Sequence, residues 1–190
     1  MTVQRADKCE LLKSKPWFPA TARKWARLPA GGGRRRIGGP EVAVNDTTFL
    51  MKVTSLLDDA LVNVWLFGGW AEELQGLAPA RGHRDVDLLY PAQDFDRVDA
   101  LIRTEPVLVE IVAKRFAHKR AFLLDGVMVE LFLVRADADG YCTDLPGGVT
   151  HRWPADVFDE RQLGMRVASV AALAGYRRMV ERRPSGPESS

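Results

Sequence analysis

The chain has 190 residues, 46% of them hydrophobic and 27% charged, which is typical of globular proteins that bury a core. No apolar run approaches the roughly 18 to 20 residues that span a bilayer, and the N-terminus does not read as a signal peptide, so we expect a soluble cytoplasmic protein. Two cysteines, Cys9 and Cys142, are too few for a zinc or disulfide framework and are expected to be free thiols.

The N-terminal segment is strongly basic. Residues 1–45 carry ten Lys or Arg against three Asp or Glu, a net charge of +7, whereas the remainder has a net charge of −5. Within it, residues 28–40 read LPAGGGRRRIGGP, a composition that cannot bury an apolar face. We predict that residues 1–43 form a flexible basic leader. Such a segment contacts nucleic acid or another acidic partner, or is a solvated tail, and we favour the tail.

Residues 44–135 are predicted to form the core. Asn45 or Asp46 is a good N-cap, and the apolar residues after it recur at helical spacing up to Leu61. The segment NVWLF predicts a short buried strand, and WAEELQGL predicts a second helix after the pair Gly68-Gly69. DVDLLY then predicts another strand, and FDRVDALIRT a helix capped by Asp94.

A hairpin follows these alternating elements. The apolar segments VLVEIV and AFLLDGVMVELFLV predict strands, and Asp125-Gly126 divides the second segment at a dipeptide that favours a two-residue turn. From Arg135 to Gly148 we expect a loop. Residues 136–190 are predicted to form acceptor-side loops and a final amphipathic helix, whose apolar residues are Val167, Val170, Leu173 and Ala174.

Two acids mark the strand DVDLLY. Asp85 and Asp87 are two residues apart, so both side chains leave one face of the strand, with Cα atoms about 6.5 Å apart. Carboxylates this close repel each other unless a cation lies between them, and Mg²⁺ prefers oxygen ligands. The apolar Val86, Leu88 and Leu89 indicate a core strand, where buried acids need a metal or basic neighbours. The alternative is a polar edge of a strand or a loop, which is where an Asp-x-Asp pattern occurs more often when nothing else marks a metal site.

Gly68-Gly69 ends one predicted strand and begins a helix. Unpaired N–H groups at a helix start favour an anion, and the missing Cβ atoms allow a phosphate to approach the backbone. We interpret the pair as a triphosphate cradle, with a simple tight turn as the alternative. The Walker A and dinucleotide-binding sequence patterns are both absent.

A third acid, Glu130, lies in the apolar segment VMVELFLV. If this strand pairs beside DVDLLY, Glu130 faces the same cavity as the two aspartates, with Met128 and Phe132 as same-face neighbours. There it either completes the metal site or takes the proton of an attacking hydroxyl. An exposed glutamate on an edge strand is the alternative.

The order of these motifs resembles the nucleotidyltransferase superfamily that includes DNA polymerase β. Within it, GGWAEELQG followed by RGHRDVDLLYP looks like the aminoglycoside and lincosamide nucleotidyltransferases, over about residues 66–134. The resemblance implies an α+β fold with a palm-like mixed sheet flanked by helices. It also implies that Asp85 and Asp87 bind Mg²⁺, that Gly68-Gly69 contacts the triphosphate, and that Glu130 matches the third carboxylate, which is commonly Asp in that family.

The resemblance further implies the reaction. A hydroxyl of a small acceptor, such as an aminoglycoside or lincosamide antibiotic, attacks the α-phosphorus of a nucleoside triphosphate, with ATP as donor and AMP as the transferred group. Arg81, Arg84 and either Lys119 or Arg120 are candidate phosphate ligands, with an ordinary surface position as the alternative for each. For His83 we favour a role in supporting the following strand, with a contact to substrate or phosphate as the alternative.

The acceptor is expected to bind outside the core, at residues 137–159 and the last helix. The acids of region 137–160 would suit a polycationic aminoglycoside, with a solvated acidic loop as the alternative, and Trp153-Pro154 is a candidate to close one side of the pocket. Two alternatives are kept. One is a toxin or antitoxin type of nucleotidyltransferase that modifies tRNA or protein, and the other is a nucleotide-binding module without turnover.

Overall fold

The computed structural model describes residues 45–182, so the predicted basic leader and the C-terminal tail lie outside the described residues. Within this range no helix is long and apolar enough to cross a membrane. The helices are α1 (Thr47–Asp59), α2 (Gly68–Leu74), α3 (Asp96–Thr104) and α4 (Val170–Glu181), with one turn of 3₁₀ helix, η1 (Val112–Lys114). The strands are β1 (Trp65–Phe67), β2 (Asp85–Pro91), β3 (Leu108–Glu110), β4 (Lys119–Leu124), β5 (Val127–Asp137), β6 (Gly140–Leu145), β7 (Val149–Trp153), β8 (Glu160–Gln162) and β9 (Met165–Val167).

The sheet is mixed, as predicted. Its main path runs β3-β4-β5-β2-β1-β9-β8, and β6 and β7 continue from the end of β5. Strand β2 lies between β5, which is parallel to it, and β1, which is antiparallel to it. The predicted α+β fold is therefore confirmed for the described part of the chain.

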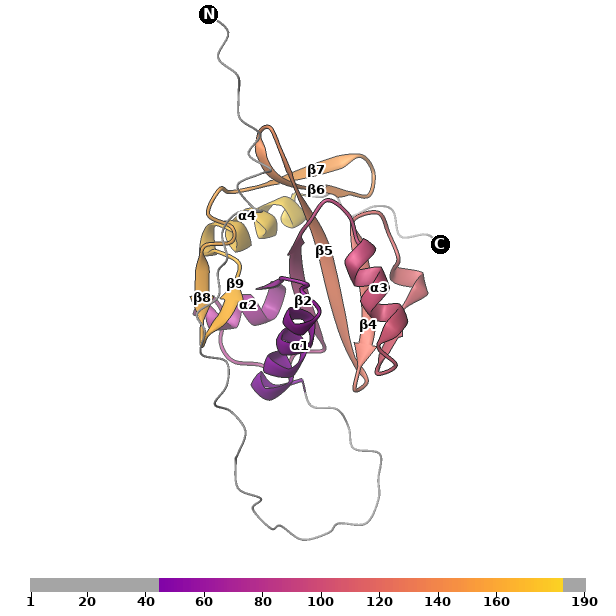
Figure 1. The fold of residues 1–190 in the computed structure, drawn as a ribbon. Helices are drawn as coiled ribbons and strands as arrows, with labels where there is room; N and C mark the ends of the chain where they lie inside the picture. The colour runs from indigo at the N-terminus through magenta and orange to yellow at the C-terminus, as the bar shows by residue number, and fades with distance from the viewer. Residues whose placement is uncertain (1–44, 183–190) are drawn as a thin grey trace, which may run out of the picture. The chain divides into compact units, whose positions relative to one another are not determined.

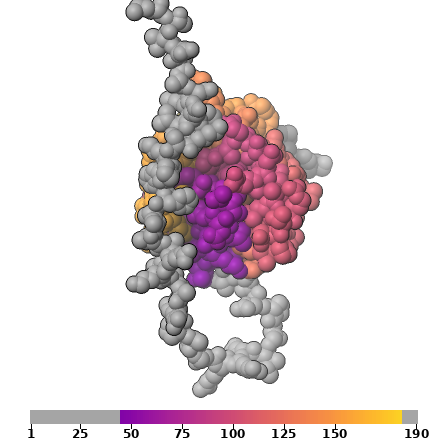
Figure 2. All heavy atoms as spheres, viewed as in Figure 1, coloured from indigo at the N-terminus to yellow at the C-terminus, as the bar shows by residue number. Residues whose placement is uncertain are grey.

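The two faces of the central strand differ in chemistry. Val86 and Leu88 are fully buried, and they alternate along β2 with the partly exposed Asp85 and Asp87. Because side chains of a strand alternate between faces, the two acids point away from the side of the sheet that holds Val86 and Leu88. Figure 1 shows α1 and α3 in front of the sheet, and Figure 2 shows them forming adjoining parts of that surface.

Local signals at the element ends are mostly confirmed. Asp46 caps α1 and accepts a hydrogen bond from the N–H of Phe49 at 2.9 Å. Asp94 accepts one from the N–H of Asp96 at 3.0 Å, but the N-cap of α3 is Phe95, one residue later than predicted. Helix α2 begins at Gly68, before the predicted start at Trp70.

The predicted hairpin is present. Strands β4 and β5 pair directly from Leu124 and Val127, and the two turn residues Asp125 and Gly126 have φ values of +51° and +79°. Positive φ at both positions is what the favoured two-residue turn requires, and Asp-Gly supplies it at low strain.

The prediction of a loop from Arg135 to Gly148 is wrong. Strand β5 continues to Asp137, and β6 and β7 form a further antiparallel pair. These strands are held partly by polar contacts, including the Arg135–Asp144 and Arg152–Asp137 ion pairs and a hydrogen bond of 2.8 Å from Thr143 Oγ1 to the carbonyl of Leu133. The mixed polar composition hid their strand pattern.

The C-terminal helix is confirmed, but it is shorter than predicted. Ser169 caps α4 and accepts a hydrogen bond from the N–H of Ala172 at 3.2 Å, so the helix starts at Val170. Val167, which we placed on the helix, is a buried residue of β9 and pairs with Leu66 of β1. The two-strand pair β8–β9 was not predicted, because three-residue strands are too short to show a period.

Candidate active site

The three predicted acids lie on neighbouring strands. In the parallel register of β2 and β5, Asp87 is paired with Glu130 and Asp85 with Met128. Paired residues of adjacent strands point to the same face, so all three carboxylates emerge on one side of the sheet. The condition set from the sequence, that the strand of Glu130 lies beside DVDLLY, is met.

Gly68 approaches the central acid closely. Phe67, the last residue of β1, pairs with Asp87, and the chain turns into α2 directly after it. A Cβ atom at Gly68 would lie 2.3 Å from Oδ2 of Asp87, and Gly68 has a φ of +61°. Both the space and the backbone conformation therefore require glycine at this position.

Gly69 approaches the loop before β2. A Cβ atom there would lie 2.9 Å from Nη2 of Arg81 and 3.0 Å from Nδ1 of His83. The glycine pair thus borders Asp87 on one side and a basic loop on the other. Main-chain N–H groups and nearby cations in this position are suited to bind phosphate oxygens.

A hydrogen-bond network fixes the start of β2. The side-chain amide of Asn45 donates to the carbonyls of Asp85, at 3.0 Å, and His83, at 3.2 Å. The indole N–H of Trp70 in turn donates to Oδ1 of Asn45 at 3.1 Å. Sequence reasoning considered Asn45 only as a helix cap, because nothing local shows a contact forty residues away.

His83 belongs to the same network. Its ring stacks on Trp70 with centroids 4.1 Å apart, and its Nε2 lies 2.9 Å from Oε2 of Glu73. The same carboxylate oxygen accepts the backbone N–H of Arg81 at 3.1 Å. Hydrogen bonding to His83 and to that N–H lowers the pKa of Glu73. His83 therefore holds the loop before β2, in agreement with the supporting role that we favoured.

The basic residues considered as phosphate ligands differ in their exposure and in their ion-pair partners. Arg81 is exposed, with Nη2 3.9 Å from Oε2 of Glu72, and Arg84 is exposed with no ion pair to any residue of the described range. Arg120 is not at the site, because it pairs with Asp99 at 2.7 Å and lies over the ring of Phe95. Of the two alternatives, it is Lys119 that reaches an acid of the site.

The charge around Asp87 is unbalanced. Burial and the neighbouring negative charges of Asp85 and Glu130 raise the pKa of Asp87 to about 7. When a carboxyl group resists ionisation because two other acids are near it, a bound cation offsets the repulsion between the negative charges and is strongly favoured. This electrostatic strain supports a divalent cation at Asp85 and Asp87.

Glu130 is in a different environment. It is buried, and its two oxygens contact the ammonium groups of Lys114 and Lys119 respectively. Burial pushes the pKa of Glu130 up, but the two lysines outweigh burial and hold it below its usual range. No cluster of three or more His, Cys, Asp or Glu residues in the described range is arranged to hold a metal. The pair Asp85 and Asp87 remains the candidate.

The acidic region 137–160 is partly paired with arginines. Arg152 pairs with Asp137 and Asp139, and Arg135 pairs with Asp144. These ion pairs involve three of the six acids of the region, and Asp156, Asp159 and Glu160 form no ion pair with a residue of the described range. Trp153 is not a pocket wall, because it is buried, stacks on Tyr176 and donates to Oγ1 of Thr143 at 2.9 Å.

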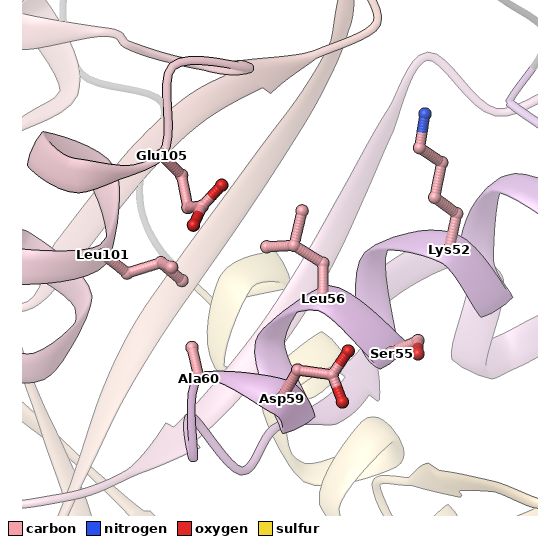
Figure 3. Close-up of a pocket in the computed structure, with 7 residues that line it drawn as sticks. All are labelled: Lys52, Ser55, Leu56, Asp59, Ala60, Leu101 and Glu105. Atoms are coloured by element: carbon pink, nitrogen blue, oxygen red, sulfur yellow. The ribbon is translucent and has the colours of Figure 1, made fainter. Parts of the chain in front are cut away.

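A surface groove lies away from these residues. It has a volume of about 520 Å³ and runs between α1 and α3, where Leu56 and Leu101 face each other (Figure 3). None of the three acids and neither glycine lines it, so it is not the site of the predicted chemistry. Its remaining lining residues are Lys52, Ser55, Asp59, Ala60 and Glu105.

Comparison with known proteins identifies the family. Residues 49–179 match the family described as aminoglycoside-2''-adenylyltransferase, and this match covers more than half of the chain. The chain belongs to the aminoglycoside-2''-adenylyltransferase family. It is therefore an enzyme of the nucleotidyltransferase class, and the resemblance noted in the sequence is confirmed.

Solved structures agree with this family at the level of the fold. ANT(2'')-Ia in complex with adenylyl-2''-tobramycin is 17% identical, with a TM-score of 0.53 over 74% of this chain and 80% of that chain. The lincosamide adenylyltransferase LnuA, bound to lincomycin, is 16% identical, with a TM-score of 0.56 over 77% of this chain and 92% of that chain. The comparison with curated protein sequences gave no match.

Proposed function

We propose that this member of the aminoglycoside-2''-adenylyltransferase family transfers AMP from ATP, with Mg²⁺, to a hydroxyl group of a small antibiotic. The observation that carries the proposal is the placement of Asp85 and Asp87 on one face of β2, directly beside the Gly68 turn. Two convergent carboxylates suit a hard divalent cation, and the main-chain N–H groups at the start of α2 suit a phosphate.

Each residue then has a defined task. Asp85 and Asp87 would hold the cation, which supplies neutralising charge to the phosphate oxygens when it is bound. The Gly68-Gly69 backbone and the exposed Arg81 and Arg84 would bind the triphosphate.

The transfer is a displacement at phosphorus. The acceptor oxygen forms a bond to the α-phosphorus while the bond from that phosphorus to the bridging oxygen breaks, and pyrophosphate leaves with the electron pair. The hydroxyl proton passes to a carboxylate. Glu130 is our candidate for this base rather than a metal ligand, because its oxygens face ammonium groups and not Asp85.

The chemical class of the acceptor is inferred from the ligands of the solved relatives. One solved relative is in complex with adenylyl-2''-tobramycin and the other with lincomycin, so both an aminoglycoside and a lincosamide are candidates for this chain. The pairing of Asp137, Asp139 and Asp144 with arginines reduces the negative charge that would attract a polycation, but leaves that of Asp156, Asp159 and Glu160. The acceptor must therefore be found by assay.

The proposal is tested by incubating the purified protein with ATP, GTP, CTP or UTP, with Mg²⁺, and with aminoglycosides, lincosamides or total tRNA. We expect pyrophosphate release that requires ATP and an antibiotic, and a product heavier by one AMP group. A labelled tRNA or protein product would instead support the toxin-type alternative. Nucleotide binding without pyrophosphate release from any acceptor would support the module without turnover.

Magnesium binding is expected to depend on pH. Because the pKa of Asp87 is raised to about 7, this carboxyl holds a proton at pH 6 that a cation must displace, whereas at pH 8 it is ionised. Mg²⁺ should therefore raise the Tm of the protein more at pH 8 than at pH 6. Thermal unfolding with 0 and with saturating MgCl₂ at several pH values measures this. Equal shifts at both pH values would contradict the assignment of Asp87 as a ligand.

A further inference from the structure

Two lysines from different elements converge on Glu130. Lys114 belongs to the 3₁₀ turn η1 and contacts Oε1, and Lys119 belongs to β4 and contacts Oε2. The side chain of Glu130 is only 6% exposed, so little water competes with these contacts. Each oxygen of the proposed base is thus already bound to a cation.

This arrangement conflicts with proton transfer. A carboxylate that accepts a charge-assisted hydrogen bond at each oxygen is a weakened base, and its lone pairs are partly occupied. To take a proton from an acceptor hydroxyl, Glu130 must be released from at least one lysine. The released ammonium then needs another anion, since a cation left unpaired at a partly buried site is unfavourable.

The two lysines differ in how firmly they are held. Lys119 lies in the regular β4–β5 ladder opposite Phe132, its Nζ is 4.7 Å from the centre of that ring, and its side chain is 16% exposed. Lys114 lies on a single 3₁₀ turn beyond the short edge strand β3, and its side chain is 37% exposed. Lys114 is therefore the residue that can exchange its partner at low cost.

We propose that Lys114 is a triphosphate ligand that leaves Glu130 when the nucleotide binds, while Lys119 stays in place and orients the Glu130 carboxylate. The proposal rests on the proposed function. A triphosphate offers several anionic oxygens, so the ammonium group exchanges one charged partner for another. Nucleotide binding would then make Glu130 available as a base before the acceptor reacts.

The position of the lysines agrees with this exchange. Both contact Glu130, which pairs with the proposed metal ligand Asp87 in the register of β2 and β5 and lies on the same face of the sheet. A phosphate held at Asp85, Asp87 and the glycine turn therefore lies within the electrostatic range of Lys114. The exchange needs only a rearrangement of a long, partly exposed side chain.

The test compares Lys114→Ala and Lys119→Ala with Arg115→Ala as the control. Arg115 is next to Lys114, but it pairs with Asp99 and Glu110 on the other side of the turn. ATP affinity is measured by titration calorimetry with Mg²⁺ and without acceptor, and kcat and KM are measured with acceptor. We expect Lys114→Ala to weaken ATP binding by roughly 10-fold or more, the loss of one charge-assisted hydrogen bond. Lys114→Arg should restore most of it.

Lys119→Ala is expected to leave ATP affinity within about 3-fold and to lower kcat instead, because a residue that only orients Glu130 acts after nucleotide binding. Arg115→Ala should change neither. Far-UV circular dichroism confirms that each variant is folded. Wild-type ATP affinity in Lys114→Ala, or an equal loss in Lys119→Ala, would overturn the inference while leaving the proposed function intact. If the wild-type protein bound no nucleotide, both would fail.

Discussion

Asp87→Asn is expected to lower pyrophosphate release by roughly 10²- to 10³-fold at saturating ATP and acceptor. A bound cation contributes several kcal/mol of charge stabilisation in the transition state, and each 1.36 kcal/mol is a factor of ten in rate. Asn keeps the shape of Asp but removes the charge that draws the cation to the start of β2, next to Gly68. The measurement is a coupled pyrophosphate assay with Mg²⁺ varied.

The same variant is expected to be more stable than the wild type when no metal is present. The pKa of Asp87 is raised in the folded state, so between pH 3.8 and about 7 the folded protein binds the extra proton and the free energy of unfolding falls as the pH rises. Asn does not titrate, so the free energy of unfolding of the variant does not fall in this way. At pH 8 without Mg²⁺ we expect Asp87→Asn to have a higher Tm, by at least about 2–4 °C, the shift that 1 kcal/mol gives in a chain of this size.

The matched control is Asp59→Asn, an exposed acid on α1 that belongs to the groove between α1 and α3. It should keep wild-type turnover and Tm. If the turnover of Asp87→Asn were within a factor of three of the wild-type value, the result would contradict the proposed metal-binding role of this residue. A lower Tm at pH 8 would show that Asp87 is stabilised by contacts rather than strained by its neighbours.

The central motifs were predictable from the sequence because their signals are local. Asp85 and Asp87 alternate with Val86 and Leu88, which identifies a strand with one acidic and one apolar face. Asp125-Gly126 identifies a two-residue turn, and such a turn fixes the register of β4 against β5. These short-range rules place Glu130 on a strand that the sheet then brings next to Asp87.

The choice between Lys119 and Arg120 as the residue that reaches the site could have been made from the same register. A two-residue turn at Asp125-Gly126 pairs Ala121 with Glu130 and Lys119 with Phe132, so Lys119 shares the face of Glu130 and Arg120 does not. Counting from the turn would have selected Lys119. The contact of Lys114 with Glu130 had no such signal, because it depends on how the η1 turn folds back over the sheet edge.

Longer-range packing explains the remaining differences. The ion pairs of region 137–160 with Arg135 and Arg152 form only after β6 and β7 fold onto β5, so the sequence does not show which of its acids have a partner. Trp153 has the composition of a pocket residue but is buried against Phe67 and Tyr176. In both cases burial and pairing depend on segments far away in the chain.

Gly68→Ala compared with Gly76→Ala separates backbone strain from crowding at Asp87. Both glycines have positive φ, +61° and +70°, so alanine strains each backbone by about 1 kcal/mol. At Gly76 no atom lies within 4 Å of the added Cβ, whereas at Gly68 it meets Oδ2 of Asp87 at 2.3 Å. The backbone strain should lower the Tm of both variants by a similar few degrees. The contact of the added Cβ with Asp87 should lower the Tm of Gly68→Ala further.

Only Gly68→Ala is expected to lose activity, by roughly 100-fold, because displacing Asp87 by about an ångström disturbs the proposed cation and phosphate positions together. The assay measures kcat and KM for ATP in both variants at a temperature at which each remains folded. Gly76→Ala should retain wild-type values of both constants. If the two variants lost activity equally, the loss would come from disturbance of helix α2, which begins at Gly68 and ends before Gly76, and not from contact with the acid. If Gly68→Ala kept full activity, the turn would not be part of the nucleotide site.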